Sequence, residues 1–137
     1  MKNTFYKRDK YKLINKEDLT KLENISENID LRRSRYCMHR NENSSIHKMI
    51  ICLNKKTKIN LHSHIDGIET IIVINGKAKL EIYNNKKKLI KTIFLDKNNF
   101  YAEVPKNSIH TIKVITNFFN FLEIKTGPFI KNNTIYY

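Results

Sequence analysis

The sequence predicts a mainly β domain, a sandwich or closed barrel, with one short helix near the N-terminus. From residue 31 onward, apolar and polar residues alternate with the period of two that is typical of half-buried strands. In the clearest run, Ala78, Leu80 and Ile82 alternate with polar neighbours. Turn-forming residues recur about every ten positions, and no helical pattern alternates with the strands, which disfavours a parallel α/β sheet.

The length of 137 residues suits a single domain that buries its own core. We expect residues 1–30 to form an N-terminal arm and helix packed on the β domain. Residues 31–130 are expected to form the β domain itself, and residues 131–137 a C-terminal tail. The arm carries several aromatic and aliphatic residues, which either pack on the domain or contribute to a homodimer.

Residues 16–29 are predicted to form the helix. Asn15 can cap its first turn, where Asp18 lies near the positive end of the helix dipole. One face carries an approximate apolar stripe, which we interpret as core packing. The stripe consists of Leu19, Leu22, Ile25 or Ser26, and Ile29.

Strand-like runs cover most of the remaining chain, and Asn-rich turns separate them. Asn75 and Gly76 suit a tight hairpin, because both residue types tolerate a positive φ. The chain has only three glycines, so we expect asparagine to adopt many of the left-handed turn conformations. The predicted strands are residues 33–40, 47–54, 68–75, 77–83, 88–95, 109–116 and 118–125.

Lysine and arginine total 26 against 13 acidic residues, for a net charge of +13. These basic residues are scattered, and no recognition helix, zinc finger or stacking aromatic pattern accompanies them, so we do not expect a nucleic-acid partner. The N-terminus lacks the apolar region of a secretory signal, and no run is apolar enough to span a membrane. We therefore expect a cytoplasmic protein. Cys37 and Cys52 lie in apolar runs, which favours buried, reduced thiols over a disulfide or a zinc site.

A metal-binding pattern stands out at His62, His64 and Glu69. Residues two apart on a strand point to the same face, so both imidazoles can reach one point inside the domain. A turn at Asp66 and Gly67 would reverse the chain, and Glu69 would then open the next strand. A buried carboxylate needs a cation or a hydrogen-bond donor beside it, because burying it unpaired is costly.

His110 completes the pattern, at the start of a strand that follows a turn at Pro105 and Asn107. Three imidazoles and one carboxylate suit one divalent ion, either Fe, Mn, Ni, Co or Zn. The predicted metal ligands are therefore His62, His64, Glu69 and His110. An octahedral ion would keep two positions open for water or substrate.

These residues resemble the two sequence motifs of the cupin superfamily. The residues that match are His62, His64, Glu69, Gly76, Pro105 and His110. The resemblance implies a single cupin double-stranded β-helix, a jelly-roll barrel. Lys56, Asn99 and Asn107 replace three glycines of the motifs, and Val114 replaces an asparagine, but no metal ligand is lost.

A narrower resemblance, over residues 30–130, is to the WbuC family of cupin-fold metalloproteins found among bacterial surface-polysaccharide genes. It rests on Arg33, Arg35 and His39 before the barrel, and on a closing segment that runs from Glu123 through Lys125 to Gly127, Pro128 and Phe129. The basic residue that this family usually has just before the glutamate is replaced here by Gly67 and Ile68. The resemblance implies a metal site, and a link to sugar metabolism only loosely.

Further candidates surround the predicted metal site. Arg33, Arg35 and Lys125 could bind an anionic group of a substrate, although the two arginines could equally pair with Glu123 or another acid. Glu123 could act as acid or base, or form a rim salt bridge with Lys125. His39 and Tyr101 are alternative catalytic groups.

The sequence leaves three functions open. The first is a metal-dependent isomerase or epimerase that acts on a small, anionic, sugar-like substrate, in polysaccharide or nucleotide-sugar metabolism. The second is an Fe(II) dioxygenase, which uses the same ligands. The third is a non-catalytic cupin that binds or senses a saccharide.

Overall fold

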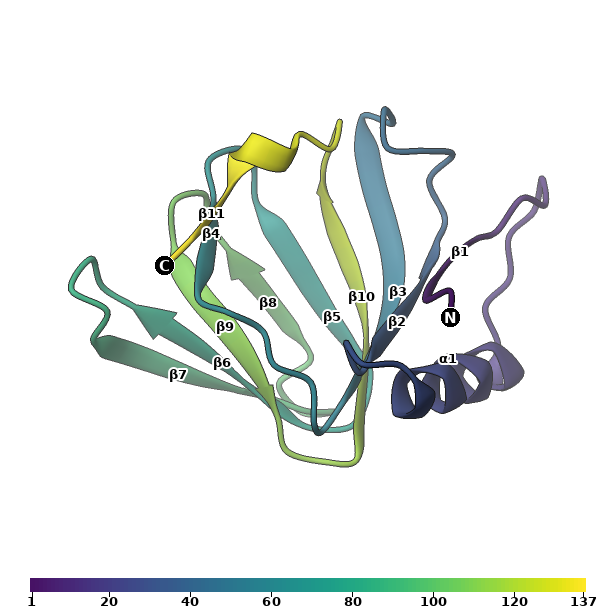
Figure 1. Ribbon diagram of the computed structural model, residues 1–137, viewed down its shortest axis with the longest axis horizontal. Helices are drawn as coiled ribbons and strands as arrows, with labels where there is room; N and C mark the ends of the chain where they lie inside the picture. The colour runs from purple at the N-terminus through teal and green to yellow at the C-terminus, as the bar shows by residue number, and fades with distance from the viewer.

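The computed structural model describes residues 1–137 and contains two β-sheets and one α-helix (Figure 1). The first sheet has the strand order β1-β2-β3-β10-β5-β8 and the second β11-β4-β9-β6-β7. In the first sheet the strands are β1 (Thr4–Tyr6), β2 (Arg33–Cys37), β3 (Ile46–Asn54), β10 (Phe118–Thr126), β5 (Glu69–Asn75) and β8 (Tyr101–Val104). In the second they are β11 (Thr134–Tyr136), β4 (His62–His64), β9 (Ile109–Val114), β6 (Ala78–Tyr83) and β7 (Leu89–Leu95). The predicted mainly β architecture is confirmed.

The main core lies between the two sheets. Ile51, Phe119 and Ile71 contribute to it from the first sheet, and Leu80 and Ile112 from the second. These residues alternate along their strands with residues that point outward, because successive side chains of a strand point to opposite faces. The alternation in the sequence therefore identified the core.

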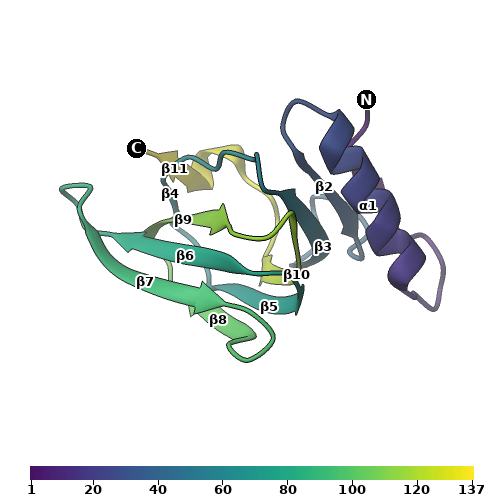
Figure 2. The ribbon, with the colours of Figure 1, turned by 90° about the horizontal axis from the view of Figure 1, so that it is seen from below.

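The helix α1 (Lys16–Asn28) covers the outer face of the first sheet, beside β2 and β3 (Figure 2). Asn15 and Asp18 form a reciprocal capping box at its start, as predicted. Leu22 is fully buried and packs with Tyr36 and Ile50 of the sheet. The predicted helix and its apolar stripe are confirmed.

Both cysteines are free and buried, as predicted, but they lie on opposite faces of the first sheet. Cys37 belongs to the core between the sheets, whereas Cys52 lies under the helix, with its Sγ 3.7 Å from the hydroxyl of Ser26. They are therefore separate packing residues.

The hairpin predicted at Asn75 and Gly76 is wrong. The strands on either side, β5 and β6, do not pair with each other, because the chain crosses here from the first sheet to the second. Gly76 has a φ of +86°, and a Cβ atom would clash with the carbonyl oxygen of Phe118. Position 76 therefore requires glycine where the chain crosses between the sheets. The hairpin lies instead between β6 and β7, where Lys87 has a φ of 60°.

Both ends of the chain take part in the sheets. The N-terminal arm forms β1, which pairs in parallel with β2. The segment expected as a C-terminal tail forms a 3₁₀-helix (Lys131–Asn133) and then β11, which pairs with β4. The chain contains no helix with the length and apolar character needed to cross a membrane.

Candidate metal centre

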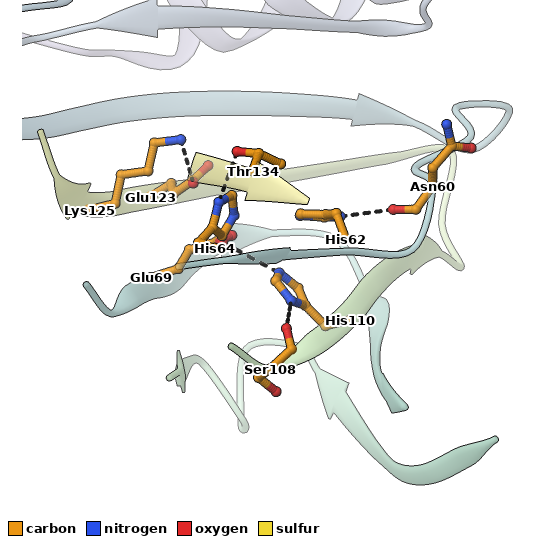
Figure 3. Close-up of polar contacts among 9 residues, drawn as sticks. All are labelled: Asn60, His62, His64, Glu69, Ser108, His110, Glu123, Lys125 and Thr134. Atoms are coloured by element: carbon orange, nitrogen blue, oxygen red, sulfur yellow. Dashed lines mark hydrogen bonds and ion pairs between the residues drawn. The ribbon is translucent and has the colours of Figure 1, made fainter. Parts of the chain in front are cut away.

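The four predicted ligands meet between the two sheets (Figure 3). His62 and His64 point inward from β4, and His110 does so from β9, where it lies directly opposite His62. Glu69 is the first residue of β5 and reaches the site from the other sheet. The structure thus brings together all four predicted ligands.

Two residues with a left-handed backbone conformation lie in the loops beside the site. Gly67 has a φ of +66° in the turn between β4 and β5, as the sequence indicated. Asn107 has a φ of 63°, a conformation that asparagine tolerates better than most residues. Its backbone N–H donates to the carbonyl oxygen of His64 at 2.7 Å, so this turn holds the end of β4.

The donor atoms are close enough to share one ion. One ligand atom from each of the four residues lies within 4.8 Å of all the others. The Oε2 atom of Glu69 is 3.0 Å from Nε2 of His64 and 3.4 Å from Nε2 of His110. Ligands at about 2.1 Å from a shared ion are at most about 4.2 Å apart, so the cluster is close to the size of a metal site.

The histidine tautomers fit metal binding. Nδ1 of His62 is 2.8 Å from the carbonyl oxygen of Asn60, and Nδ1 of His110 is 2.8 Å from that of Ser108. A carbonyl oxygen only accepts hydrogen bonds, so Nδ1 carries the proton in both neutral rings. The Nε2 lone pairs therefore face the centre of the cluster. This arrangement is usual for histidines that bind metals.

Two buried atoms of the cluster lack a hydrogen bond. These are Oε2 of Glu69 and Nε2 of His110, which face each other. In the neutral His110 ring, with Nδ1 protonated, both atoms present lone pairs, and the contact is unfavourable unless a second proton or a metal cation lies between them. A divalent ion would satisfy both, so the residues present fit such an ion.

The electrostatics of the cluster favour neutral His62 and charged Glu69. Burial, together with neighbouring His110, lowers the pKa of His62 to about 4. Burial opposes the charged form of Glu69, but His110 and His64 outweigh it and hold the pKa of Glu69 below its usual value. Burial also opposes charge on His110, yet the Glu69 carboxylate raises the pKa of His110 above 6.5.

The cluster opens into a cavity of about 570 Å³ with a cationic wall. The basic side chains that line it are Arg33, Arg35, Lys58 and Lys125. Lys58 was not foreseen, because it lies outside the predicted strands and matches no motif. The only acids in the lining are Glu69 and Glu123, so the cavity suits an anionic ligand.

Glu123 is the buried acid of this cavity. Burial and the nearby charge of Glu69 raise the pKa of Glu123 to about 7. Its Oε1 atom is 4.0 Å from Nζ of Lys125, the loose ion pair considered from the sequence. A carboxyl group that titrates near neutral pH can accept or donate a proton during catalysis.

The two arginines lie on the inward face of β2. The Nε of Arg35 donates to the hydroxyl of Thr4 at 3.2 Å, so β1 orients the guanidinium. Neither Arg33 nor Arg35 forms an ion pair within 4.0 Å, and the alternative in which they pair with Glu123 is not found. Their charges are available to a ligand.

His39 and Tyr101, proposed as catalytic alternatives, lie outside the cavity. β2 ends at Cys37, so His39 no longer follows the strand's alternation. Its ring stacks on that of His47, with centroids 4.0 Å apart. Tyr101 is 54% exposed, and its hydroxyl donates to Glu103 on the outer side of β8. Neither side chain lines the cavity, so the structure does not bring either of them to the four ligands.

Comparison with known proteins gives one family and a fold. Residues 14–95 match the model of a family described as a domain of unknown function, DUF6016. A search of curated proteins finds no match to the sequence.

Several solved structures share the arrangement of strands. The structure of CapF with the inhibitor 3-isopropenyl-tropolone matches with a TM-score of 0.66 and 14% identity, over 79% of this chain and 32% of that chain. Lactobacillus farciminis oxalate decarboxylase in a formate complex matches at 0.55 and 21% identity, over 68% and 27%. Bacillus subtilis oxalate decarboxylase, described with Mn(II) centres, matches at 0.55 and 19%, over 68% and 24%.

These likenesses show the fold: the two sheets form a cupin sandwich, as the motifs predicted. The chain spans between a quarter and a third of the length of these three proteins. The narrower resemblance to WbuC stays a prediction.

Proposed function

The chain belongs to the DUF6016 family, and from the site that its cupin fold builds we propose that it is a metal-dependent enzyme. The proposed reaction is an isomerisation or epimerisation of a small, anionic, sugar-like substrate. The observation that carries this proposal is the position of Glu123, a buried carboxyl with a pKa of about 7, in the same cavity as the three imidazoles.

His62, His64, His110 and Glu69 would hold the ion. The donor set accommodates Fe, Mn, Ni, Co or Zn, and the Mn(II) centres described for the Bacillus subtilis enzyme support a divalent ion. When bound, such an ion supplies Lewis-acid polarisation of a substrate carbonyl. Polarisation makes the hydrogen on the neighbouring carbon more acidic.

Glu123 is then placed to move that proton. Its carboxylate removes the proton from the carbon next to the carbonyl, leaving an enediolate on the substrate. In an isomerisation, the protonated carboxyl group returns the proton to the adjacent carbon on the same face, and a hydroxyl proton moves from one enediolate oxygen to the other. In an epimerisation, water protonates the opposite face of the same carbon, and Glu123 releases its own proton to solvent. Both routes are redox-neutral overall. Without an ion, burial and the charge of Glu69 raise the pKa of Glu123 to about 7. A bound cation would offset the charge of Glu69 and lower this pKa, which favours the carboxylate form that removes the proton.

The arginines would hold the anionic end of the substrate. Arg35 pairs with Ile51 of β3, which pairs with Phe121 of β10, so these residues lie in one row across the first sheet. With about 4.8 Å between neighbouring strands, the backbone of Arg35 lies about 10 Å from β10 and about 14 Å from β5. The cavity therefore suits an extended molecule, with its anionic group at β2 and its reacting carbon at the metal.

A sugar phosphate or nucleotide sugar meets this description. The resemblance to the WbuC family adds surface-polysaccharide metabolism as the proposed setting. Apolar lining residues such as Ile59 and Phe129 could contact the less polar faces of a sugar ring.

Hydrogen exchange with solvent tests the reaction class. The metal-loaded protein is incubated in D₂O with a set of sugar phosphates and nucleotide sugars. Loss of a carbon-bound proton signal is followed by NMR. At least one substrate is expected to exchange, and Glu123→Gln should abolish exchange while metal affinity is kept. Glu103→Gln, an exposed acid outside the cavity, is the matched control and should exchange like the wild type.

Two other outcomes would replace the proposal. Binding of a saccharide with no exchange would indicate a non-catalytic binding cupin. Oxygen consumption by the iron-loaded protein, again without exchange, would indicate a dioxygenase.

A further inference from the structure

One of the three imidazoles is oriented differently from the others. His62 and His110 each bond through Nδ1 to a backbone carbonyl two residues earlier in the chain. For His64, the Nδ1 partner is the hydroxyl of Thr134, 3.2 Å away on β11. The far end of the chain therefore orients this ring.

The strand that carries His62 and His64 depends on the same segment. β4 pairs with β9 at a single position, His62 opposite His110. With β11 it pairs along its whole length, from Thr134 opposite His64 to Tyr136 opposite His62. Most of the register of β4 is thus set by β11.

Further hydrogen bonds connect β11 and its flanks with β4. The backbone N–H of Ile65 donates to the carbonyl of Asn133 at 3.0 Å, and that of Tyr137 donates to Leu61 at 3.1 Å. The hydroxyls of Ser63 and Tyr137 are 2.8 Å apart. We call residues 133–137 the C-terminal strap. The Tyr136 ring in this strap also lies beside His62, with centroids 6.1 Å apart.

The strap buries little apolar surface of its own. Tyr136 is 67% exposed, and Ile135 and Tyr137 are 42% and 43% exposed. Its docking therefore depends mainly on hydrogen bonds to β4. Segments of this kind open at a low free-energy cost relative to core strands.

We propose that the C-terminal strap positions His64 and His62 for the metal, and that strap docking and metal binding stabilise each other. The inference rests on the metal site of the proposed function. Linkage requires the coupling to be reciprocal: a docked strap raises the affinity for the ion, and a bound ion holds the strap in place. Thr134 acts through the His64 ring in this role, so it is a positioning residue.

The hydroxyl of Thr134 suits this role. A hydroxyl can accept a hydrogen bond from a protonated Nδ1 or donate one to an unprotonated Nδ1. By accepting from a protonated Nδ1, it can hold the His64 ring with the Nε2 lone pair free for an ion. Valine has nearly the same shape and can do neither, whereas serine keeps the hydroxyl.

Calorimetric titration with Co(II) tests the first half of the proposal. Thr134→Val is expected to weaken Co(II) binding by about 10- to 100-fold, the usual effect of losing a partner that orients a metal-binding histidine. Thr134→Ser should restore wild-type affinity. Thr92→Val, on β7 in the same sheet, is the control and should bind like the wild type. The visible spectrum of bound Co(II) should change in Thr134→Val alone, which a general loss of stability would not produce.

Carboxypeptidase digestion of the 137-residue chain tests the second half of the proposal. Removal of the last residues should slow markedly when Co(II) is added, and Thr134→Val should reduce this protection. Equal Co(II) affinity in the wild type and Thr134→Val, together with a digestion rate that Co(II) does not change, would overturn the proposed role of the strap. The proposed metal site would not be affected by that result. Failure of the wild type to bind any of the five metals would overturn the metal site and the strap together.

Discussion

His62 and His110 lie directly opposite each other on β4 and β9, and their ring centroids are 4.3 Å apart. A shift of one residue in this register would turn one of the two rings to the outer face of the sheet. The site therefore depends on a single alignment between two strands that are far apart in the sequence.

Metal affinity should fall with decreasing pH, and the fall should begin above pH 6.5. Binding needs unprotonated imidazoles, and the Glu69 carboxylate raises the pKa of His110 despite its burial. His62, whose pKa burial lowers to about 4, stays neutral throughout this window. Once the pH is below the pKa of His110, Co(II) affinity should drop about tenfold per pH unit.

Calorimetric titrations with Co(II) from about pH 8 to about pH 5.5 measure this change in affinity. The range includes the usual histidine pKa. An affinity that stays constant down to about pH 5.5 would show that Glu69 does not hold a proton on His110 in the metal-free protein.

Anion binding at β2 should depend on Arg35. Arg35→Gln should weaken the binding of pyrophosphate to the metal-free protein by at least about tenfold, because a hydrogen bond to a charged group contributes about 1.5–3 kcal/mol. Arg40→Gln, at an exposed position beyond β2, is the matched control. Equal loss in both variants, measured by calorimetry, would indicate attraction by the net charge of +13 and no specific anion site.

The helix should stabilise the fold without affecting the site. Leu22 is fully buried under the outer face of the first sheet, so Leu22→Ala should lower the free energy of unfolding by about 2–5 kcal/mol. Leu13→Ala, at a residue that is 69% exposed, should change it by less than about 0.5 kcal/mol. Urea denaturation measures both values. Weaker Co(II) binding by folded Leu22→Ala would contradict this separation of helix and site.

Much of the fold and the four ligands could be predicted because their signals are local. Alternation identifies which face of a strand is buried, so the inward positions of His62, His64 and His110 follow from the sequence once these segments are strands. The turn at Gly67 and the capping box at Asn15 also depend on neighbouring residues only. Glu69 was found because a buried carboxylate at a strand start calls for a partner.

The remaining features depend on contacts between distant segments. The residues around Asn75 and Gly76 predict a turn, but they do not show whether the two strands on either side pair with each other or belong to different sheets. His39 was expected to share the inward face of Arg33 and Arg35, because the strand was predicted to continue to residue 40. The strand ends at Cys37, so this expectation does not apply to His39. The strap was missed because three residues after a polar stretch give a weak strand signal, and Thr134 gains its role only through its pairing with His64.

Three imidazoles and Glu69 are proposed to hold one divalent ion. The metal content of the protein tests this, measured by elemental analysis after purification without chelators and after equilibration with Fe, Mn, Ni, Co and Zn. We expect about one ion per chain and a higher melting temperature with metal, because an ion that binds only the folded state stabilises it. Both effects should be lost in the His62→Ala/His64→Ala double variant. Absence of metal under every condition, with no change in melting temperature, would show that these four residues do not form a metal site.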